Sequence, residues 1–402
     1  MLNVNGDAVL ATLRTLAGFG AVGSGVCRPA LSPADLAARR WLAGEMERIG
    51  LKATIDAVGN LYGAAPGAGR SVLIGSHSDS VPTGGWLDGT LGLAYGLEIA
   101  RAWMEAHPGA PVGIDLIDFS DEEGRFLSCL GSRSFCGDLP GLPAGFAEEA
   151  ASAGLDTTGM GTAPPLRLDP QRHRAFFEAH IEQGPRLEAA GLPIGVVTGI
   201  FGMRRYAVRF DGRADHAGTT PIALRRDAAR LLYRFADACH HRFRQAGSTD
   251  SVWNLGKVSL QPGAVNVVVE RGELLLEFRD LDPVALDGLS AALAMLVDEF
   301  DGQEGVRVSL EEAGRLAPVS LDPTLRGLVA DAAAARGARS MPLPSGAIHD
   351  AMVLARSVPT TMLFVPSIGG RSHTPVEDTR AEDIVLGAHV LAQAVFACAE
   401  SL

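Results

Sequence analysis

The chain has no excess of basic residues and no long apolar run, and no secretory signal is expected. Asp and Glu outnumber Lys and Arg by 47 to 35, which gives a formal net charge of −12. Proteins that bind duplex nucleic acid usually carry a basic patch, so no nucleic-acid partner is expected. No apolar stretch reaches the ~18 residues of a membrane span, and the first residues lack a basic segment followed by an apolar one. We therefore expect a cytoplasmic protein without a membrane partner.

The cysteines are few and isolated. There are 5 of them, and none stands in a Cys-x-x-Cys pair. This pattern argues against a disulfide framework and against a cysteine-rich structural zinc site, and it is typical of a reducing compartment. Hydrophobic residues make up 47% of the 402 residues and charged residues 20%, as in globular proteins. A chain of this length usually forms more than one domain, so we expect two.

Short apolar runs bounded by turns alternate with helical patterns in the first and last parts of the chain. We expect buried strands at residues 71–75, 112–119 and 361–365. We expect helices at residues 7–17, 32–50 and 88–106. The second helix begins with Ser32 as a cap and Pro33 in the first turn. This alternation predicts an α/β domain with a mixed, mostly parallel sheet covered on both faces.

The middle of the chain has a different pattern. Residues 203–210 alternate polar and apolar side chains, as a half-buried strand does. The elements expected next are a helix at 221–243, strands at 251–260 and 273–279, a helix at 283–300 and a strand at 305–311. The order β-α-β-β-α-β predicts a ferredoxin-like α+β domain inserted into the larger one. We expect residues 1–200 and 315–402 to form the larger domain and 201–314 the insertion.

Histidine and carboxylate side chains gather in short segments rich in Gly, Ser or Pro. These candidate residues are His77, Asp88, Glu122, Glu123, His180 and His373. His77, Glu123 and His373 each follow an expected strand, and ligands of α/β sheets bind beyond the carboxyl ends of strands. Imidazole nitrogens and carboxylate oxygens together suit zinc, manganese or cobalt. One such histidine alone is more simply a structural residue, but the set predicts a two-metal hydrolytic site.

The adjacent Glu122 and Glu123 are expected to differ in role. In a compact turn their side chains diverge, so one can bind a metal while the other faces a water molecule. The second glutamate would take a proton from the water and pass it to the leaving nitrogen. Paired glutamates are also common on exposed helices, so the pair alone is weak evidence.

Longer strings around these residues resemble the amidase, hydantoinase and carbamoylase family of dinuclear metal hydrolases. The family includes N-carbamoyl-L-amino acid amidohydrolases, β-ureidopropionases and allantoate amidohydrolases. The strings are Gly75-Ser-His-Ser-Asp-Ser-Val-Pro-Thr-Gly-Gly85, Asp121-Glu-Glu-Gly124, His180-Ile-Glu-Gln-Gly-Pro185, His216-Ala-Gly-Thr-Thr-Pro221 and Gly369-Gly-Arg-Ser-His-Thr-Pro375. The strings that begin at His180 and His216 are specific to this branch, and the peptidase relatives generally lack both.

The resemblance implies two divalent metal ions per subunit. Zinc is expected first, with manganese, cobalt or nickel as alternatives. Asp88 is expected to bridge the ions, with His77 and His180 on different ions. Glu123 and His373 would complete the two sites.

The resemblance also implies roles for residues beside the metals. Glu122 is the expected general base, and Asp79 is expected to orient the His77 ring. His216, on the insertion, is expected to stabilise the oxyanion, often in the active site of a partner subunit. The insertion would therefore be a lid and dimerisation domain, and we expect a homodimer.

The expected substrate is a small molecule with a carboxylate. Arg279 is expected to bind that carboxylate as a bidentate fork, with Asn266 as a second contact. The alternative for Arg279 is a structural role, in which it forms a salt bridge on the surface of a strand. Gln183 and His349 are further expected substrate contacts.

These roles predict hydrolysis of the ureido C–N bond of N-carbamoyl-L-amino acids to amino acid, ammonia and carbon dioxide. The alternatives are an allantoate amidohydrolase or a β-ureidopropionase, then a dipeptidase or aminoacylase, or an inactive binding protein. The complete ligand set with its base argues against the last. Two departures from the family pattern concern the substrate pocket: Ile348 stands where relatives often have glycine, and the segment 124–131 is shorter by a residue or two.

Overall fold

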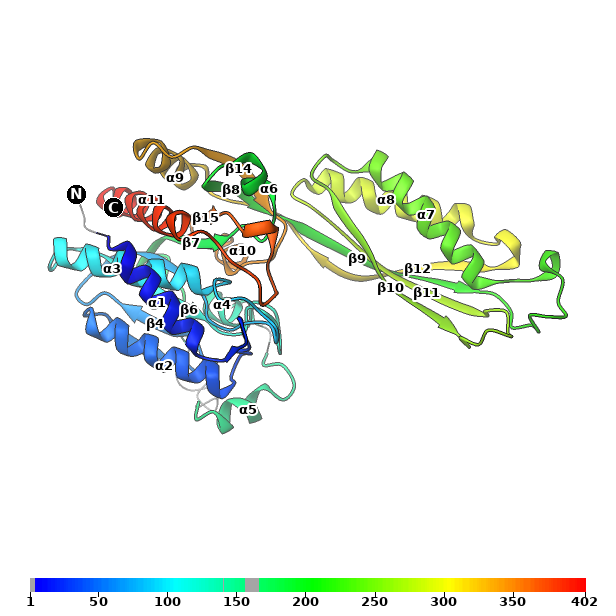
Figure 1. The fold of residues 1–402 in the computed structure, drawn as a ribbon, viewed down its shortest axis with the longest axis horizontal. Helices are drawn as coiled ribbons and strands as arrows, with labels where there is room; N and C mark the ends of the chain where they lie inside the picture. Colours follow the sequence, from blue (N-terminus) through cyan, green and yellow to red (C-terminus); the bar gives the residue numbers. More distant parts are fainter. Residues whose placement is uncertain (1–3, 140, 156–165) are drawn as a thin grey trace. The chain divides into compact units, whose positions relative to one another are not determined.

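The computed structural model describes residues 4–139, 141–155 and 166–402. The chain divides into two compact units (Figure 1). Unit 1 comprises Met1–Thr198 and Ser320–Leu402, and unit 2 comprises Gly199–Val319. A catalytic role for unit 1 and a lid and dimerisation role for unit 2 remain proposals.

Unit 1 is built on a 9-stranded mixed sheet of order β13-β8-β15-β7-β5-β6-β4-β3, with β14 paired to β8. The central strands run parallel: β15 (Thr360–Val365), β7 (His173–Ile181), β5 (Arg70–His77) and β6 (Val112–Phe119). The outer strands are β3 (Lys52–Ile55), β4 (Leu61–Ala64), β8 (Ile194–Ile200), β13 (Val319–Ser320) and β14 (Ser340–Ser345). The predicted α/β sheet with a parallel centre is confirmed.

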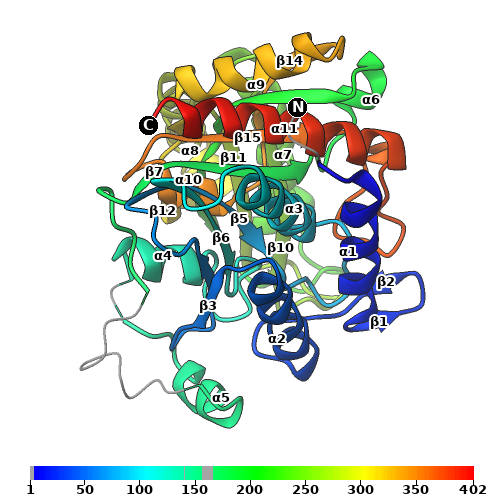
Figure 2. The same ribbon diagram turned by 90° about the vertical axis from the view of Figure 1, so that its left-hand side faces the viewer.

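Helices cover both faces of this sheet (Figure 2). One layer contains α1 (Gly6–Gly18), α2 (Pro33–Arg48), α3 (Thr90–Ala106), α9 (Pro323–Ala335) and α11 (Ala381–Glu400). Alternate strand residues such as Val72 and Ile74 pack into this layer, because successive side chains of a strand point to opposite faces. The other face carries α4 (Leu130–Cys136) and α10 (Asp350–Leu354), where the ring of Phe119 meets Phe135 and Phe176 edge-on.

Smaller elements of unit 1 lie in its connections. They are the hairpin β1 (Ala21–Val22) and β2 (Gly25–Val26), and the short helices α5 (Phe146–Ser152) and α6 (Arg186–Ala190). The hairpin bonds to the loop after β5, since Val26 and Gly84 exchange both backbone hydrogen bonds at 3.0 Å. That loop leads to Asp88.

α11 is the one helix of the described residues long and apolar enough to cross a membrane, with a mean hydropathy of 1.4 over its best window. However, 61% of that window is buried inside the protein. The helix packs against α1, α3 and α9. α11 is therefore a core helix of unit 1.

Unit 2 contains a 4-stranded antiparallel sheet of order β10-β11-β9-β12. Its elements are β9 (Gly202–Asp211), α7 (Ala228–Ala246), β10 (Val252–Gln261), β11 (Arg271–Asp280), α8 (Pro283–Phe300) and β12 (Arg307–Leu316). Both helices lie on one face of the sheet (Figure 1). The predicted order β-α-β-β-α-β is confirmed, but the helix expected from residue 221 begins at Ala228. The cause is Asp227, whose side chain accepts the backbone N–H groups of Ala229 and Arg230 and caps the helix there.

Candidate metal centre

The candidate ligands lie at the carboxyl ends of the parallel strands or in the loops that follow them. β5 ends at His77, and His180 is the second-last residue of β7. Glu123 lies in the loop after β6, and His373 in the loop after β15. Asp88 stands just before α3, in a turn where Gly89 has a φ of 66°. A Cβ at position 89 would lie 2.3 Å from the His77 carbonyl oxygen, so this turn needs glycine.

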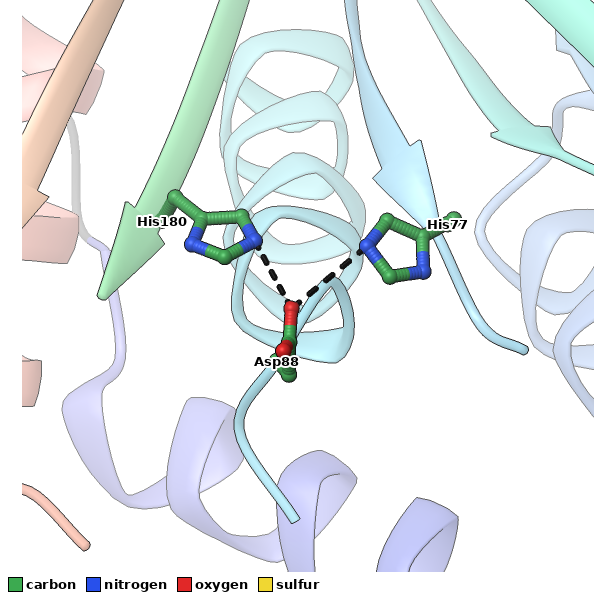
Figure 3. Close-up of side chains that lie close together, drawn as sticks. All are labelled: His77, Asp88 and His180. Atoms are coloured by element: carbon green, nitrogen blue, oxygen red, sulfur yellow. Dashed lines mark ion pairs between the residues drawn. The ribbon is translucent and has the colours of Figure 1, made fainter. Parts of the chain in front are cut away.

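The first set of ligands, which we name group 1, comprises His77, Asp88 and His180 (Figure 3). Asp88 Oδ1 lies 3.0 Å from His180 Nε2 and 3.6 Å from His77 Nε2. Each ring's Nδ1 lies near a backbone carbonyl oxygen, at 3.0 Å from Asp79 and at 2.9 Å from Ile181. Because a carbonyl only accepts, Nδ1 carries the proton in the neutral ring, and Nε2 then presents its lone pair. Buried lone pairs that face one carboxylate oxygen fit a cation between them.

The second set, group 2, comprises Asp88, Glu123 and His373. His373 Nε2 lies 3.2 Å from Asp88 Oδ2 and 3.5 Å from Glu123 Oε2. Glu123 Oε1 is buried without a hydrogen-bond partner, which is costly unless a cation is bound there. The interaction with Asp88 raises the pKa of His373 to about 9. Group 2 therefore also fits a cation.

This geometry corrects one expectation. His77 and His180 were expected on different ions, yet both Nε2 atoms face the same oxygen of Asp88. The other oxygen faces His373. The strand order gives the reason: β5 and β7 are neighbours in the sheet, so their ends bring the two histidines side by side. The role of Asp88 as the shared residue agrees with both groups, and together the groups fit a dinuclear metal centre.

Glu122 lies beside group 1. Its Oε2 is 3.7 Å from His77 Nε2, and the residue is 8% exposed. Burial, together with the negative charges of Asp350 and Glu123, raises the pKa of Glu122 well above its ordinary value. A carboxylate with a raised pKa is suited to taking up a proton and releasing it again.

Asp79 connects the two loops that carry these residues. Its carboxylate accepts the backbone N–H groups of Glu122 and Glu123, at 3.3 Å each. Its Oδ1 lies 3.8 Å from His77 Nδ1, which is too long for a hydrogen bond, and the ring contacts the Asp79 carbonyl instead. The guanidinium of the fully buried Arg39 lies 3.9 Å from the Asp79 carboxylate. Asp79 thus contacts the ring through its main chain and holds the glutamate turn through its side chain.

Backbone strain gathers at this centre. Among the described residues, six that are not glycine have a positive φ, and four of these are Asp121, Cys129, Gln183 and His373. Such conformations cost free energy and often mark functional sites. The Asp121 carboxylate supports its own turn by accepting the backbone N–H groups of residues 125–127. The turn at Asp121 is thus held by local hydrogen bonds.

Two of the expected substrate contacts lie against the ligands. Gln183 Nε2 donates to Asp88 Oδ2 at 3.0 Å. His349 is 2% exposed, its Nε2 lies 2.8 Å from Ser345 Oγ, and its ring centroid is 4.6 Å from that of His180. Burial and the nearby His180 hold the pKa of His349 well below its ordinary value. Contact of these two residues with substrate stays a prediction.

Two further contacts of Asp88 come from residues that sequence reasoning missed. Ser372 Oγ lies 3.3 Å from Asp88 Oδ2, and Glu377 Oε1 accepts the backbone N–H of Asp88 at 3.0 Å. The only signal in the sequence was that both residues lie close to His373.

Within unit 2, His216 and Asn266 belong to adjacent segments. The backbone N–H of Ala217 donates to the Asn266 carbonyl at 3.0 Å. His216 Nδ1 accepts the backbone N–H groups of Gly218 and Thr219, at 3.0 and 3.2 Å. Its Nε2 therefore carries the proton in the neutral ring, and the exposed side chain offers a donor to solvent.

Arg279 lies on the open face of the unit 2 sheet. Its neighbours along β11, Phe278 and Asp280, are buried, while Arg279 and Glu277 are partly exposed. Arg279 Nε donates to Glu277 Oε1 at 2.9 Å. A guanidinium on an accessible strand face suits recognition of a carboxylate.

Known proteins resemble this chain over nearly its whole length. Residues 73–397 match peptidase family M20/M25/M40. The N-carbamoyl-L-amino acid amidohydrolase of Geobacillus stearothermophilus is 36% identical over 391 residues, with 94% of each chain covered. The allantoate amidohydrolase of Escherichia coli (strain K12) is 34% identical over 405 residues, with 96% of each covered.

A solved structure is closer still in sequence. The crystal structure of an amidase of the hydantoinase/carbamoylase family from Burkholderia phymatum is 44% identical and superposes with a TM-score of 0.91. The alignment covers 100% of this chain and 99% of that one. The chain therefore belongs to the amidase (hydantoinase/carbamoylase) family of hydrolases, within peptidase family M20.

Proposed function

We propose that the protein hydrolyses the ureido C–N bond of N-carbamoyl-L-amino acids. The observation that carries the proposal is the pair of ligand groups that share Asp88, with Glu122 beside them. The similarity to N-carbamoyl-L-amino acid amidohydrolases supports the choice of substrate. An allantoate amidohydrolase is the second candidate, because relatives with that name are 34% and 30% identical. A β-ureidopropionase is a third.

Divalent ions bound by the two groups would polarise the substrate carbonyl and make water a better nucleophile. Glu122 takes a proton from the attacking water. The water oxygen bonds to the carbamoyl carbon, and the bond from that carbon to the amino-acid nitrogen breaks. Glu122 returns its proton to this nitrogen, so the amino acid leaves. The carbamate that remains decomposes to ammonia and carbon dioxide.

The donor set supports zinc as the ion. Imidazole nitrogen and carboxylate oxygen are common zinc ligands, and neither group contains a thiolate. Manganese, cobalt and nickel accept the same atoms and are the alternatives. We place the enzyme in the cytoplasm, in keeping with its isolated cysteines.

The substrate carboxylate would bind Arg279, with Asn266 as a second contact. Arg279 lies 2.8 Å from Glu277 in the present structure, so the substrate must share or replace that ion pair. A guanidinium can bind a carboxylate through two parallel hydrogen bonds. This requirement favours substrates with a free carboxylate over neutral amides.

Unit 2 supports a homodimer as the active form. β10 is an edge strand of 10 residues, and Val252 and Val258 on it are 48% and 46% exposed. Such an edge can pair with another chain. We propose that unit 2 mediates this pairing and that His216 acts in the partner's active site, where its Nε2–H stabilises the oxyanion.

His216→Ala should lower kcat by about 10²–10³-fold, the usual cost of losing one oxyanion donor. Mixing this variant with Glu122→Gln tests whether His216 acts in the active site of the partner subunit. If His216 serves the partner's site, mixed dimers hold one intact site each, and random mixing restores about one quarter of the wild-type activity. Activity is measured after unfolding and refolding the two variants together. No recovery, or a fully active monomer on dilution, would refute the cross-subunit role.

A substrate panel tests the proposed reaction. Metal-loaded protein is supplied with N-carbamoyl-L-amino acids, N-carbamoyl-β-alanine and allantoate, with a chelator as control. We expect release of a free α-amino acid that the chelator abolishes. Ammonia from allantoate without such an amino acid would establish the second candidate instead. A protein with metal bound that leaves the whole panel intact would refute the proposal.

A further inference from the structure

Glu377 is a buried carboxylate that joins two loops of the metal centre. It is 2% exposed, and its Oε1 accepts the backbone N–H groups of Leu87 and Asp88, both at 3.0 Å. Its Oε2 accepts a hydrogen bond from Ser372 Oγ at 3.0 Å. One loop precedes α3 and the other follows β15, so this side chain connects residues 289 positions apart in the sequence.

Ser372 extends the connection to the side chain of Asp88. Its Oγ lies 3.3 Å from Asp88 Oδ2, and Gln183 Nε2 donates to both of these atoms at 3.0 Å. Glu377 therefore holds the main chain of Asp88 directly. Gln183 holds the Asp88 carboxylate and donates to Ser372 Oγ, whose single hydrogen goes to Glu377. With both ends fixed, Oδ1 faces group 1 and Oδ2 faces group 2.

The surroundings of Glu377 are closely fitted to it. A Cβ at Gly85 would lie 2.2 Å from Glu377 Cδ, so the loop can approach the carboxylate only with glycine there. Within the described residues, Glu377 forms no ion pair with Lys or Arg, and its hydrogen bonds come from N–H and O–H groups. A buried carboxylate without a basic partner is costly. Cations in the two neighbouring groups would offset that cost.

We propose that Glu377 is a positioning residue that sets the shared carboxylate of Asp88 between the two ion sites. It acts through Leu87, Asp88 and Ser372, and it is not itself a ligand. The inference rests on the proposed metal centre, and it is independent of which ureido substrate is cleaved.

The test is a cobalt titration of metal-free protein, followed by visible absorption, for the wild type and two variants. In Glu377→Ala two buried N–H groups lose their acceptor, and we expect cobalt binding to weaken by about 10–100-fold with altered d–d bands. Glu377→Gln keeps an oxygen for the two N–H groups and a polar atom for Ser372. It should bind cobalt close to the wild type. Glu382→Ala, at a 75% exposed side chain in the first turn of α11, is the matched control.

The outcomes separate this inference from the proposed reaction. Two cobalt ions in the wild type with unchanged affinity and spectrum in Glu377→Ala would overturn the positioning role alone. If that variant does not fold, Ser372→Ala replaces it, and an unchanged spectrum there would also overturn the role. A wild type that binds no cobalt would overturn both the centre and the inference. Cobalt binding without turnover of the substrate panel would count only against the proposed reaction.

Discussion

Glu122→Gln should abolish nearly all turnover while both metal ions remain bound. The amide has the same shape as the carboxylate but cannot take up a proton from water. General acid–base catalysis usually contributes about 10²–10⁴-fold, so we expect kcat to fall by that factor. The KM should change little, because Glu122 is not among the residues proposed to bind the substrate. Steady-state kinetics and metal analysis of the same preparation provide the measurement.

The control for this prediction is Glu148→Gln. Glu148 is an exposed residue of α5, and its loss of charge should leave kcat unchanged. If Glu122→Gln kept substantial activity with both ions bound, another group would be the base. If it lost its metal ions, Glu122 would be a ligand.

Asp88→Asn should weaken both ion sites at once. Asp88 is the one residue common to group 1 and group 2, and the amide removes its negative charge. Residues that only orient a ligand already contribute about 10–100-fold to metal affinity, so losing a shared ligand should cost more than about 100-fold at each site. Hydrolysis should fall in parallel with metal content. Calorimetric titration of metal-free protein with zinc measures both sites.

A variant that removes a ligand of one group only distinguishes a shared role of Asp88 from general damage to the metal centre. His180→Gln removes a ligand of group 1 only, so it should weaken one site and leave a zinc-binding step near that of the wild type. Asp237→Asn, at an 81% exposed side chain of α7, should change neither site. Two zinc ions of wild-type affinity in Asp88→Asn would refute the shared role.

The sequence predicts the fold well because the patterns that define it are local. The strands that end near His77 and Glu123 have short apolar runs bounded by turns, and Ser32 and Pro33 mark the start of α2. The start of α7 was misplaced, because the stretch after Pro221 looks helical until the Asp227 cap is recognised. The spacing of hydrophobic residues alone does not show whether the helix starts at residue 221 or at Ala228.

The sequence names the candidate ligands, but their grouping depends on strand order. Which histidines face the same oxygen of Asp88 follows from β5 and β7 being neighbours, and no local pattern carries that information. The contacts of Glu377 with Leu87 and Asp88 join distant parts of the chain, so they were missed for the same reason. The burial of His349 against His180 likewise requires the assembled sheet.

Anomalous diffraction from crystals of the zinc-loaded protein would locate the bound ions. We expect two zinc ions, one on either side of the Asp88 carboxylate. One ion should bind His77 and His180, and the other should bind Glu123 and His373. A single ion, or His77 and His180 on different ions, would contradict the metal centre as described.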